Sequence, residues 1–441
     1  MFSVAVISLG CSKNQVDAEA MLKQFSAAGI EVKDDPAHAD CVIVNTCGFL
    51  ESARSEAIEN IIEMGKLKPE GTVKKIVVTG CMAQLVKDEI LKELPEVDAV
   101  LGLSCDNDIV KEVERVMAGE RYCSVGAPEE LSLDMPRILG NEPYYAYLKI
   151  ADGCDNRCAY CMIPAIRGRF RSRTLESVVA EAEDLAKKGV KELNVVAQDV
   201  TRYGEDRYGE KKLPELLRRL CKIDGVRWIR VLYGYPDRVT DELLDVMREE
   251  PKIVKYIDLP LQHCDGDVLR AMNRAGDEKS LRALISHIRE KVPGITIRTT
   301  LITGFPGETK NAFATLVQFV KDVKFDRLGV FPYSREEGTP AFDLPDQISD
   351  KVKDRRAEIV MEEQSFIMER ANEKKVGSTV EVLTEGYDGY VKLCYGRTAA
   401  DAPDVDGKIF FTPAKKRPAP GEIVSVKVTD VLEYDLLGEQ I

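Results

Sequence analysis

This sequence lacks long apolar runs and a basic leader segment. No apolar run reaches about 18 residues, the length that a membrane-spanning helix needs. Residues 1–8 contain no basic stretch of the kind that begins a secretory signal, and they lead directly into a strand-like pattern. We therefore expect neither a membrane span nor secretion, and we expect the protein to lie in the cytoplasm.

Basic residues are outnumbered by acidic ones, and histidine is scarce. The chain has 62 Lys and Arg against 75 Asp and Glu, a formal net charge of −13, and only 3 His. Phosphate contacts dominate nucleic-acid binding, so an acidic chain is a poor match for a nucleic acid as principal partner. The charge suits a basic protein partner instead. A length of 441 residues predicts about two to four domains.

Cysteine, in contrast, is plentiful, with 12 residues. Without a secretory signal, these cysteines indicate a reducing compartment and metal chemistry rather than disulfides. Three of them, Cys154, Cys158 and Cys161, form a C-x3-C-x2-C array. Three thiolates can hold three corners of a cubane iron–sulfur cluster and leave one iron open, whereas an electron-transfer cluster normally has four cysteines. Structural zinc is the alternative, but a structural zinc site has four protein ligands and no open position. No histidine or fourth cysteine lies near this array in the sequence.

A second set of three cysteines follows predicted strands near the amino terminus. Short apolar runs alternate with helical stretches there, a pattern typical of a parallel sheet. The strands are expected at 4–8, 41–45 and 75–79, and Cys11, Cys47 and Cys81 follow them in turn. Because parallel strands end along one edge, the three thiols can converge there on one metal centre with an open position. A single cysteine at such a place would be read as a small buried apolar residue.

The whole chain is predicted to be an α/β protein in three domains. An N-terminal parallel-sheet α/β domain covers residues 1–125, and turn-rich residues 126–143 form a linker. A central partial (βα)6 barrel covers 144–376, with the C-x3-C-x2-C array in the loop after its first strand. Short alternating strands in 377–441 predict a small antiparallel β-barrel.

The array, with Tyr160 before its last cysteine, resembles the signature of the radical S-adenosylmethionine (SAM) enzymes. That resemblance implies that the open iron binds SAM, which is cleaved to a radical that abstracts hydrogen. It also implies that Tyr160 lies against the adenine; as a side chain alone, Tyr160 also fits an ordinary half-buried aromatic. Gln198 and Asp199 end a barrel strand and are candidates to contact SAM, as is Arg298 for its carboxylate. A purely structural role is the alternative for these three.

Two three-cysteine sites, a partial barrel and a terminal β-barrel together resemble the radical SAM methylthiotransferases over essentially the whole chain. The resemblance implies two [4Fe-4S] clusters, an auxiliary one on Cys11, Cys47 and Cys81 and a SAM cluster on the central array, and a terminal barrel of the TRAM, OB-like type. Four segments are similar to the branch that acts on an aspartate of a small-subunit ribosomal protein, namely 10–14, 196–199, 330–339 and 401–407.

That branch implies insertion of sulfur and a methyl group at the aspartate β-carbon, with two SAM used per product. It also implies a reductant such as flavodoxin or ferredoxin. Residues 377–441 hold more acidic than basic side chains, which fits a cationic ribosomal protein better than RNA. Two alternatives remain: the branch that modifies a tRNA adenosine, and a non-catalytic iron–sulfur or zinc protein. Arg167 is expected to pack the cysteine loop, and Glu336 to lie in a charged surface turn.

Overall fold

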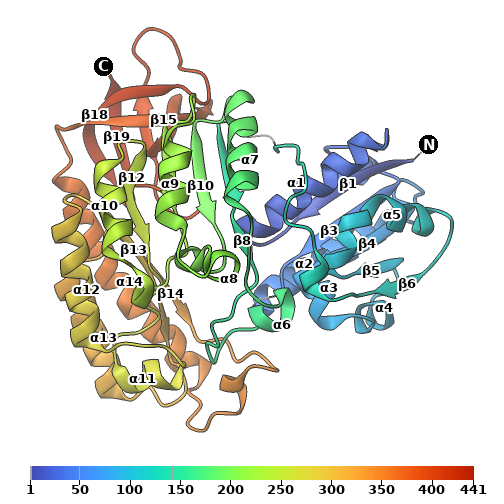
Figure 1. The fold of residues 1–441 in the computed structure, drawn as a ribbon, viewed down its shortest axis with the longest axis horizontal. Helices are drawn as coiled ribbons and strands as arrows, with labels where there is room; N and C mark the ends of the chain where they lie inside the picture. The colour runs from blue at the N-terminus through green and yellow to red at the C-terminus, as the bar shows by residue number, and fades with distance from the viewer. Residues whose placement is uncertain (1, 49, 141–143) are drawn as a thin grey trace.

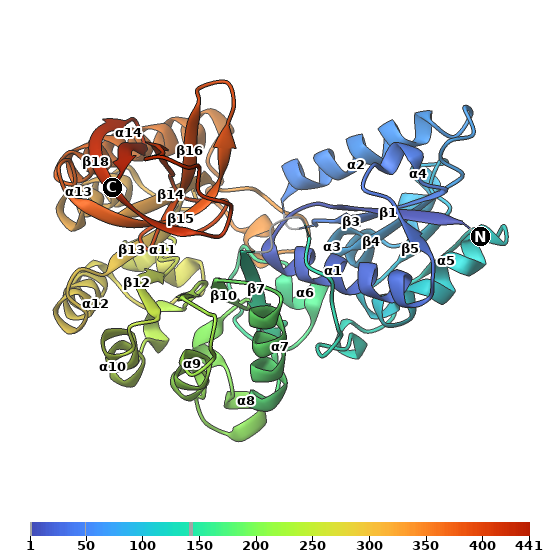
Figure 2. The same cartoon turned by 90° about the horizontal axis from the view of Figure 1, so that it is seen from above.

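The computed structural model describes residues 2–48, 50–140 and 144–441. Two α/β units lie side by side, and a small β-barrel sits on the second (Figure 1). The view from above shows the N-terminal unit beside the central one, with the C-terminal barrel covering one end of the latter (Figure 2). The α/β class and the closed terminal barrel are as predicted. None of the helices in the described residues is long and apolar enough to cross a membrane.

The N-terminal unit is a six-stranded parallel sheet in the order β2-β1-β3-β4-β5-β6. Its strands are β1 (Ser3–Ser8), β2 (Glu31–Val32), β3 (Cys41–Thr46), β4 (Lys75–Gly80), β5 (Ala99–Leu101) and β6 (Tyr122–Ser124). Its helices are α1 (Ser12–Ala27), α2 (Glu51–Lys66), α3 (Cys81–Val86), α4 (Glu89–Glu93) and α5 (Ile109–Met117). Every residue of β3 is buried, because helices cover both faces of a parallel sheet.

The central unit is a six-stranded parallel sheet curved into an open barrel, in the order β14-β13-β12-β11-β10-β7. Its strands are β7 (Tyr145–Lys149), β10 (Glu192–Val196), β11 (Trp228–Val231), β12 (Ile253–Asp258), β13 (Thr296–Thr303) and β14 (Arg327–Pro332). Its helices are α6 (Ile163–Arg167), α7 (Leu175–Lys187), α8 (Glu205–Tyr208), α9 (Leu213–Cys221), α10 (Asp241–Glu249), α11 (Gly266–Ala271), α12 (Glu278–Lys291), α13 (Lys310–Val323) and α14 (Asp350–Glu373).

The predicted linker, 126–143, is more than a spacer as far as it is described; residues 141–143 lie outside the described part. Its Arg137 is buried and reaches three elements. The guanidinium pairs with Glu19 of α1 and with Glu181 of α7, and it donates to the carbonyl of Tyr147 in β7. The segment therefore ties the two α/β units together by a buried charge network.

The C-terminal unit is a closed five-stranded barrel in the order β15-β16-β17-β19-β18. Its strands are β15 (Thr379–Asp388), β16 (Leu393–Thr398), β17 (Ile409–Thr412), β18 (Ile423–Leu432) and β19 (Asp435–Gln440). β17 and β19 pair parallel, while the other neighbours pair antiparallel. This one parallel pair departs from the predicted antiparallel barrel, because the last strand was not anticipated and returns to close the sheet beside β17.

A side chain from each of the six central strands bonds to this barrel. The contacts involve residues near the end of β16 and the loop that follows it. They are Tyr147 Oη to Asp404, Glu192 to Arg397, Arg230 to the Ala399 carbonyl, Tyr256 Oη to Asp406, Arg298 to Asp406, and Arg327 to Asp401. The C-terminal unit thus closes the end of the central barrel opposite the cysteine loop, and we call this interface the basal seal.

The basal seal changes the interpretation of the acidic C-terminal charge. Asp401 and Asp406 are buried against arginines of the same chain, and Glu385 pairs with Arg397. These carboxylates are therefore neither solvated turns nor free to attract a cationic partner. The acidic excess in residues 377–441 gives correspondingly less support to a basic substrate than the sequence suggested.

Candidate functional site

The C-x3-C-x2-C array lies in a loop after β7, at the carboxyl edge of the central sheet. A short antiparallel pair, β8 (Ala151–Asp152) with β9 (Arg171–Ser172), closes the base of this loop. Gly153 begins it with φ of +77°, and a Cβ there would lie 2.0 Å from the Arg169 carbonyl oxygen. Only glycine permits both that conformation and that close backbone approach. The loop is therefore held in one shape before any ligand is considered.

Two side chains from other segments approach Cys158. The Tyr235 hydroxyl, after β11, and Nη1 of Arg274, after α11, each lie 3.8 Å from its sulfur. Arg274 also stacks 4.2 Å from the centre of the Tyr235 ring and lies 3.5 Å from the Tyr160 hydroxyl. Neither Tyr235 nor Arg274 carried a sequence signal, because each is far from the array along the chain. Arg274 brings positive charge to the place where thiolates would form.

The other three cysteines stand at the ends of neighbouring strands, as the spacing predicted. Cys11 precedes α1, Cys47 follows β3, and Cys81 begins α3 after β4. At Gly10, φ is +96° and a Cβ would lie 2.7 Å from Cys47 Cβ, so this close approach requires glycine. The Cys81 sulfur lies 3.5 Å from Asn14 Oδ1.

The segment that follows the central array packs against the N-terminal cysteine group across the junction of the α/β units. Cys81 shares a hydrophobic cluster with Met162 and Ile166, which directly follow the central array. Arg167, at the end of α6, extends Nη2 to within 3.5 Å of the Cys81 sulfur and 2.6 Å of Asn14 Oδ1. Sequence reasoning placed Arg167 beside its own loop only. The structure makes it a direct link to the other cysteine group.

Arg167 belongs to a buried network of opposite charges. It pairs with Asp17 of α1 at 2.9 Å and with Asp152 of β8 at 2.8 Å. Lys149 of β7 pairs with the same two carboxylates. Buried ion pairs must be mutually satisfied to be tolerated, since a buried charge without a partner is costly. The network therefore specifies how the two units dock.

The thiol pKa values differ between the cysteines. Burial raises the pKa of Cys81 to about 12, that of Cys154 to about 11 and that of Cys161 to about 12. Burial also acts to raise the pKa of Cys11, but the charges of Lys13 and Arg167 outweigh it and lower that pKa below its usual value. Metal binding at the raised thiols must release protons, because the thiolate is the ligand.

The donor set and its surroundings fit iron–sulfur clusters better than a single ion. In the described part of the chain, no three His, Cys, Asp or Glu side chains are arranged to hold one metal ion. A cubane binds each thiolate through a different iron, so its ligands encircle a cluster rather than one atom. Within the described residues, two of the buried polar atoms that have no hydrogen-bond partner are Ser12 Oγ, next to Cys11 in the chain, and Oε1 of Gln198, whose amide donates to Asp152 at the base of the cysteine loop. Such atoms suit a polar ligand that the sites would take up.

The structure places the other residues predicted to contact SAM in different parts of the central unit. Gln198 donates to Asp152 at 2.8 Å, and its carbonyl oxygen is the free atom noted above. Asp199 is fully buried and accepts from Asn156 in the cysteine loop at 2.9 Å and from Arg238 at 2.6 Å. Asp199 thus holds the loop in place.

Arg298 is placed in the basal seal, where it pairs with Asp258 at 3.1 Å and Asp406 at 3.5 Å. The structure does not bring it to the cysteine loop, because it lies early in β13 and its charge is already compensated. Tyr160 packs against the central core beside the cysteines. Contacts of Tyr160, Gln198 and Asp199 with SAM stay predictions.

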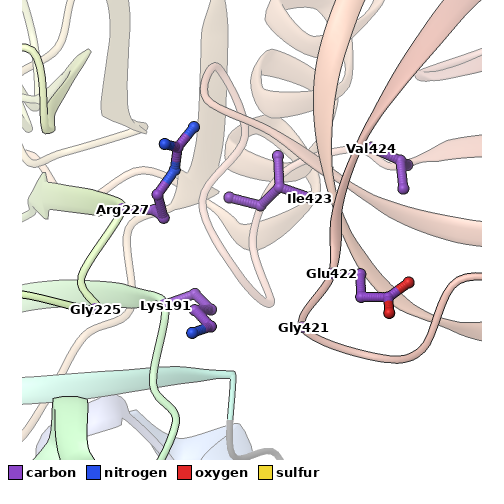
Figure 3. Close-up of a pocket in the computed structure, with 7 residues that line it drawn as sticks. All are labelled: Lys191, Gly225, Arg227, Gly421, Glu422, Ile423 and Val424. Atoms are coloured by element: carbon purple, nitrogen blue, oxygen red, sulfur yellow. The ribbon is translucent and has the colours of Figure 1, made fainter.

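Among the cavities formed by the described residues, a pair on the central unit bears on the site. One, of about 490 Å³, lies at the seam between Lys191 and Arg227 on one side and Gly421–Val424 on the other (Figure 3). None of the predicted site residues lines it, so it is remote from the chemistry. The other, of about 460 Å³, is bounded by residues of the cysteine loop and by Tyr235 and Arg274. This second cavity adjoins Cys158.

Comparison with known families divides the chain into three matched parts. Residues 3–102 match an uncharacterized protein family, UPF0004; residues 148–320 match the Radical SAM superfamily; and residues 376–441 match the TRAM domain. The second match includes the C-x3-C-x2-C array, and the first includes the other three cysteines.

Several relatives that match over nearly the whole chain carry the same name. A protein of Desulforamulus reducens called ribosomal protein uS12 methylthiotransferase RimO is 47% identical over 445 residues, covering 100% of this chain and 99% of the relative. A protein of the same name from Caldanaerobacter subterraneus is 47% identical over 440 residues and covers 100% of both chains. Among solved structures, the radical SAM methyltransferase TsrM from Kitasatospora setae aligns with a TM-score of 0.57 at 16% identity, over 77% of each chain, and it shares the fold.

Proposed function

Since this chain belongs to the RimO family of radical SAM methylthiotransferases and is a transferase, we propose that it replaces a β-hydrogen of an aspartate in ribosomal protein uS12 with a methylthio group. The observation that supports the proposal is the contact of the segment following the central cysteine array with the N-terminal cysteine group, made by Arg167 and by Met162 and Ile166. The proposed setting is the cytoplasm, where thiols stay reduced.

The six cysteines are the proposed ligands of two [4Fe-4S] clusters. Cys154, Cys158 and Cys161 would hold the SAM-binding cluster; Cys11, Cys47 and Cys81 would hold the auxiliary one. Each set has three thiolates, so each cubane keeps one iron for an external ligand. When bound, the clusters and SAM supply electron transfer, hydrogen abstraction and sulfur delivery, which no side chain can provide.

The surrounding side chains of this chain would position those groups and exclude water. Asp199 and Gly153 fix the shape of the cysteine loop, and Gln198 Oε1 is a free acceptor for an N–H of SAM. Arg274 and Arg167 place positive charge beside one cysteine of each group. Two SAM molecules per product and a one-electron reductant complete the proposal.

Mass spectrometry of both candidate substrates tests the proposal. Anaerobically reconstituted protein is incubated with SAM and dithionite, together with either uS12 or bulk tRNA. We expect a methylthio mass gain on a uS12 aspartate and 5′-deoxyadenosine in the supernatant. A gain on tRNA alone would assign the chain to nucleic-acid modification. Zinc without iron after reconstitution, and no SAM cleavage, would contradict catalysis altogether.

A further inference from the structure

A carboxylate of the central unit caps a helix of the N-terminal unit. Helix α2 begins directly after Leu50, whose side chain has no polar atom and forms no capping bond. The N–H of Glu51 instead donates to Oε1 of Glu336 at 3.1 Å, and Glu336 lies in the segment after β14. Negative charge at a helix N-terminus is favourable, because the first N–H groups of the helix are unpaired and its dipole is positive there. The start of α2 is therefore fixed by a residue 285 positions away in the chain.

Arg54 of α2 extends this contact to the residue that follows Cys47. Its Nη2 pairs with Oε2 of Glu336 at 2.7 Å, and its Nη1 donates to the carbonyl of Gly48 at 3.3 Å. Gly48 packs so closely on the N-terminal cysteine group that a Cβ there would lie 2.8 Å from the backbone of Cys81. A shift of Gly48 would therefore disturb both Cys47 and Cys81. We call Glu336, Arg54 and the bonds that they make to α2 and Gly48 the interunit latch.

The carboxylate of Glu336 is buried and bonded on both oxygens. Its side chain is 4% exposed and accepts from the Ser334 hydroxyl at 2.6 Å, in addition to the two donors from α2. The N–H and the hydroxyl of Thr339 both donate to the Glu336 carbonyl, which closes a tight turn around this residue. A buried charge that is paired in this way is held in one geometry, and loss of a partner is costly. The latch is therefore preorganised.

The segment that carries Glu336 also bonds to the loop of the central array. The N–H of Ala341 donates to the carbonyl of Ala159, which lies within the array, at 2.8 Å. A Cβ on Gly338 would lie 3.3 Å from the terminal methyl of Met162, the residue after the array. One short segment thus joins the loop of the central array to the start of α2.

We propose that Glu336 is a positioning residue that fixes Cys47 in relation to the central array, so that methylthio transfer stays coupled to SAM cleavage. This inference rests on the proposed function, in which the two cysteine groups act on one substrate. Glu336 acts through Arg54 and Gly48, not by contact with the substrate. Opening the latch alters none of the six cysteines, so each group keeps its metal ligands while Cys47 loses its fixed place. A misplacement of about 1 Å can lower a rate by about a hundredfold.

Two measurements on the apoprotein test the latch without turnover. Glu336→Gln replaces one acceptor oxygen by an NH2 group that faces either Arg54 or the Glu51 N–H, and Arg54→Met removes the cation. In both variants we expect alkylation of Cys47 by iodoacetamide, followed on its proteolytic peptide, to become about tenfold faster, as for loss of one charge-assisted hydrogen bond. Amide hydrogen exchange at Glu51 should also accelerate.

The double variant and a neighbouring carboxylate supply the controls. Glu336→Gln/Arg54→Met should match the single variants, because both changes break one contact. Glu337→Gln changes the adjacent, exposed carboxylate and should leave both rates as in the wild type. Wild-type rates in the latch variants, or the same acceleration in Glu337→Gln, overturn the proposal.

The reconstituted protein separates positioning from a general loss of structure. The latch variants should bind as much iron as the wild type and form 5′-deoxyadenosine with dithionite at a nearly unchanged rate. The methylthio product on uS12 per 5′-deoxyadenosine should fall about tenfold or more. An unchanged ratio, or a parallel loss of iron and SAM cleavage, overturns the positioning role. No product from the wild type refutes the proposed function, while the apoprotein rates still decide whether Glu336 fixes Cys47.

Discussion

Nη2 of Arg167 lies 3.5 Å from the sulfur of Cys81, although the two residues belong to different α/β units. The same guanidinium pairs with Asp17 and Asp152, so it joins α1, α3 and the cysteine loop at one point. Arg167 therefore joins Lys149 and Arg137 as a buried cation that fixes how the two α/β units dock.

Arg167→Met should destabilise the protein, because it removes a buried cation that bridges the two α/β units. The change leaves Asp17 and Asp152 with only Lys149 as a cation, and removing one partner of a buried pair costs about 3–5 kcal/mol. We expect a large fall in the urea midpoint of the apoprotein. Arg169→Met is the control, since Arg169 is 84% exposed and should change stability little. Equal midpoints for the two variants would contradict the bridging role.

Cysteine substitutions should remove one cluster at a time. Cys47→Ala and Cys158→Ala are each expected to lower bound iron after anaerobic reconstitution to about half, because thiolate ligands hold each cubane. The double variant should bind almost none. Cys221→Ala, at a half-buried cysteine of α9 outside both groups, should keep full iron. A full iron complement with Cys47→Ala would refute the auxiliary site.

The position of Cys11, Cys47 and Cys81 at one edge of the sheet was predictable, because it depends on strand order and spacing. Parallel strands that each end in cysteine must deliver the thiols to one edge, and the array carries its own local signature. Arg274 and Tyr235 could not be foreseen, because their approach to Cys158 depends on how α11 and the loop after β11 pack. Glu336 was expected in a surface turn, yet it is buried and pairs with Arg54 of α2. Contacts between the two units do not produce a repeating pattern of residues, so the sequence alone does not predict them.

Loss of one carboxylate in the basal seal should destabilise both the central and C-terminal units. Glu192 is fully buried and pairs with Arg230 at 2.9 Å and Arg397 at 2.7 Å. Glu192→Gln leaves two buried guanidinium groups undercompensated, at a cost of about 3–5 kcal/mol. Glu381→Gln removes an exposed carboxylate near the same junction and should cost at most about 1 kcal/mol. Chemical denaturation of the two variants compares them directly, and similar losses would contradict the proposed strength of the seal.

The free energy of unfolding should fall as pH rises toward 8, because the carboxyl of Asp106 is buried and has a raised pKa. Burial, followed by the nearby charge of Asp17, raises the pKa of this carboxyl to about 8, although Thr79 donates to it. Between the usual pKa near 4 and the raised one, the folded state holds a proton that the unfolded state has lost. The free energy of unfolding therefore declines by up to about 1.4 kcal/mol per pH unit in this window. Asp106→Asn should reduce the difference between the urea midpoints at pH 5 and pH 8. An unchanged difference would contradict the assignment of this pH dependence to Asp106.

The basal seal has a consequence for exchanging modules between enzymes. Each strand of the central barrel contributes one polar contact to the terminal unit, so the two surfaces match bond for bond. A foreign terminal barrel transplanted onto this catalytic core would confront orphaned guanidinium groups at its base. An exchange of terminal barrels between such proteins should succeed only when the residues on both sides of the basal seal are transferred together.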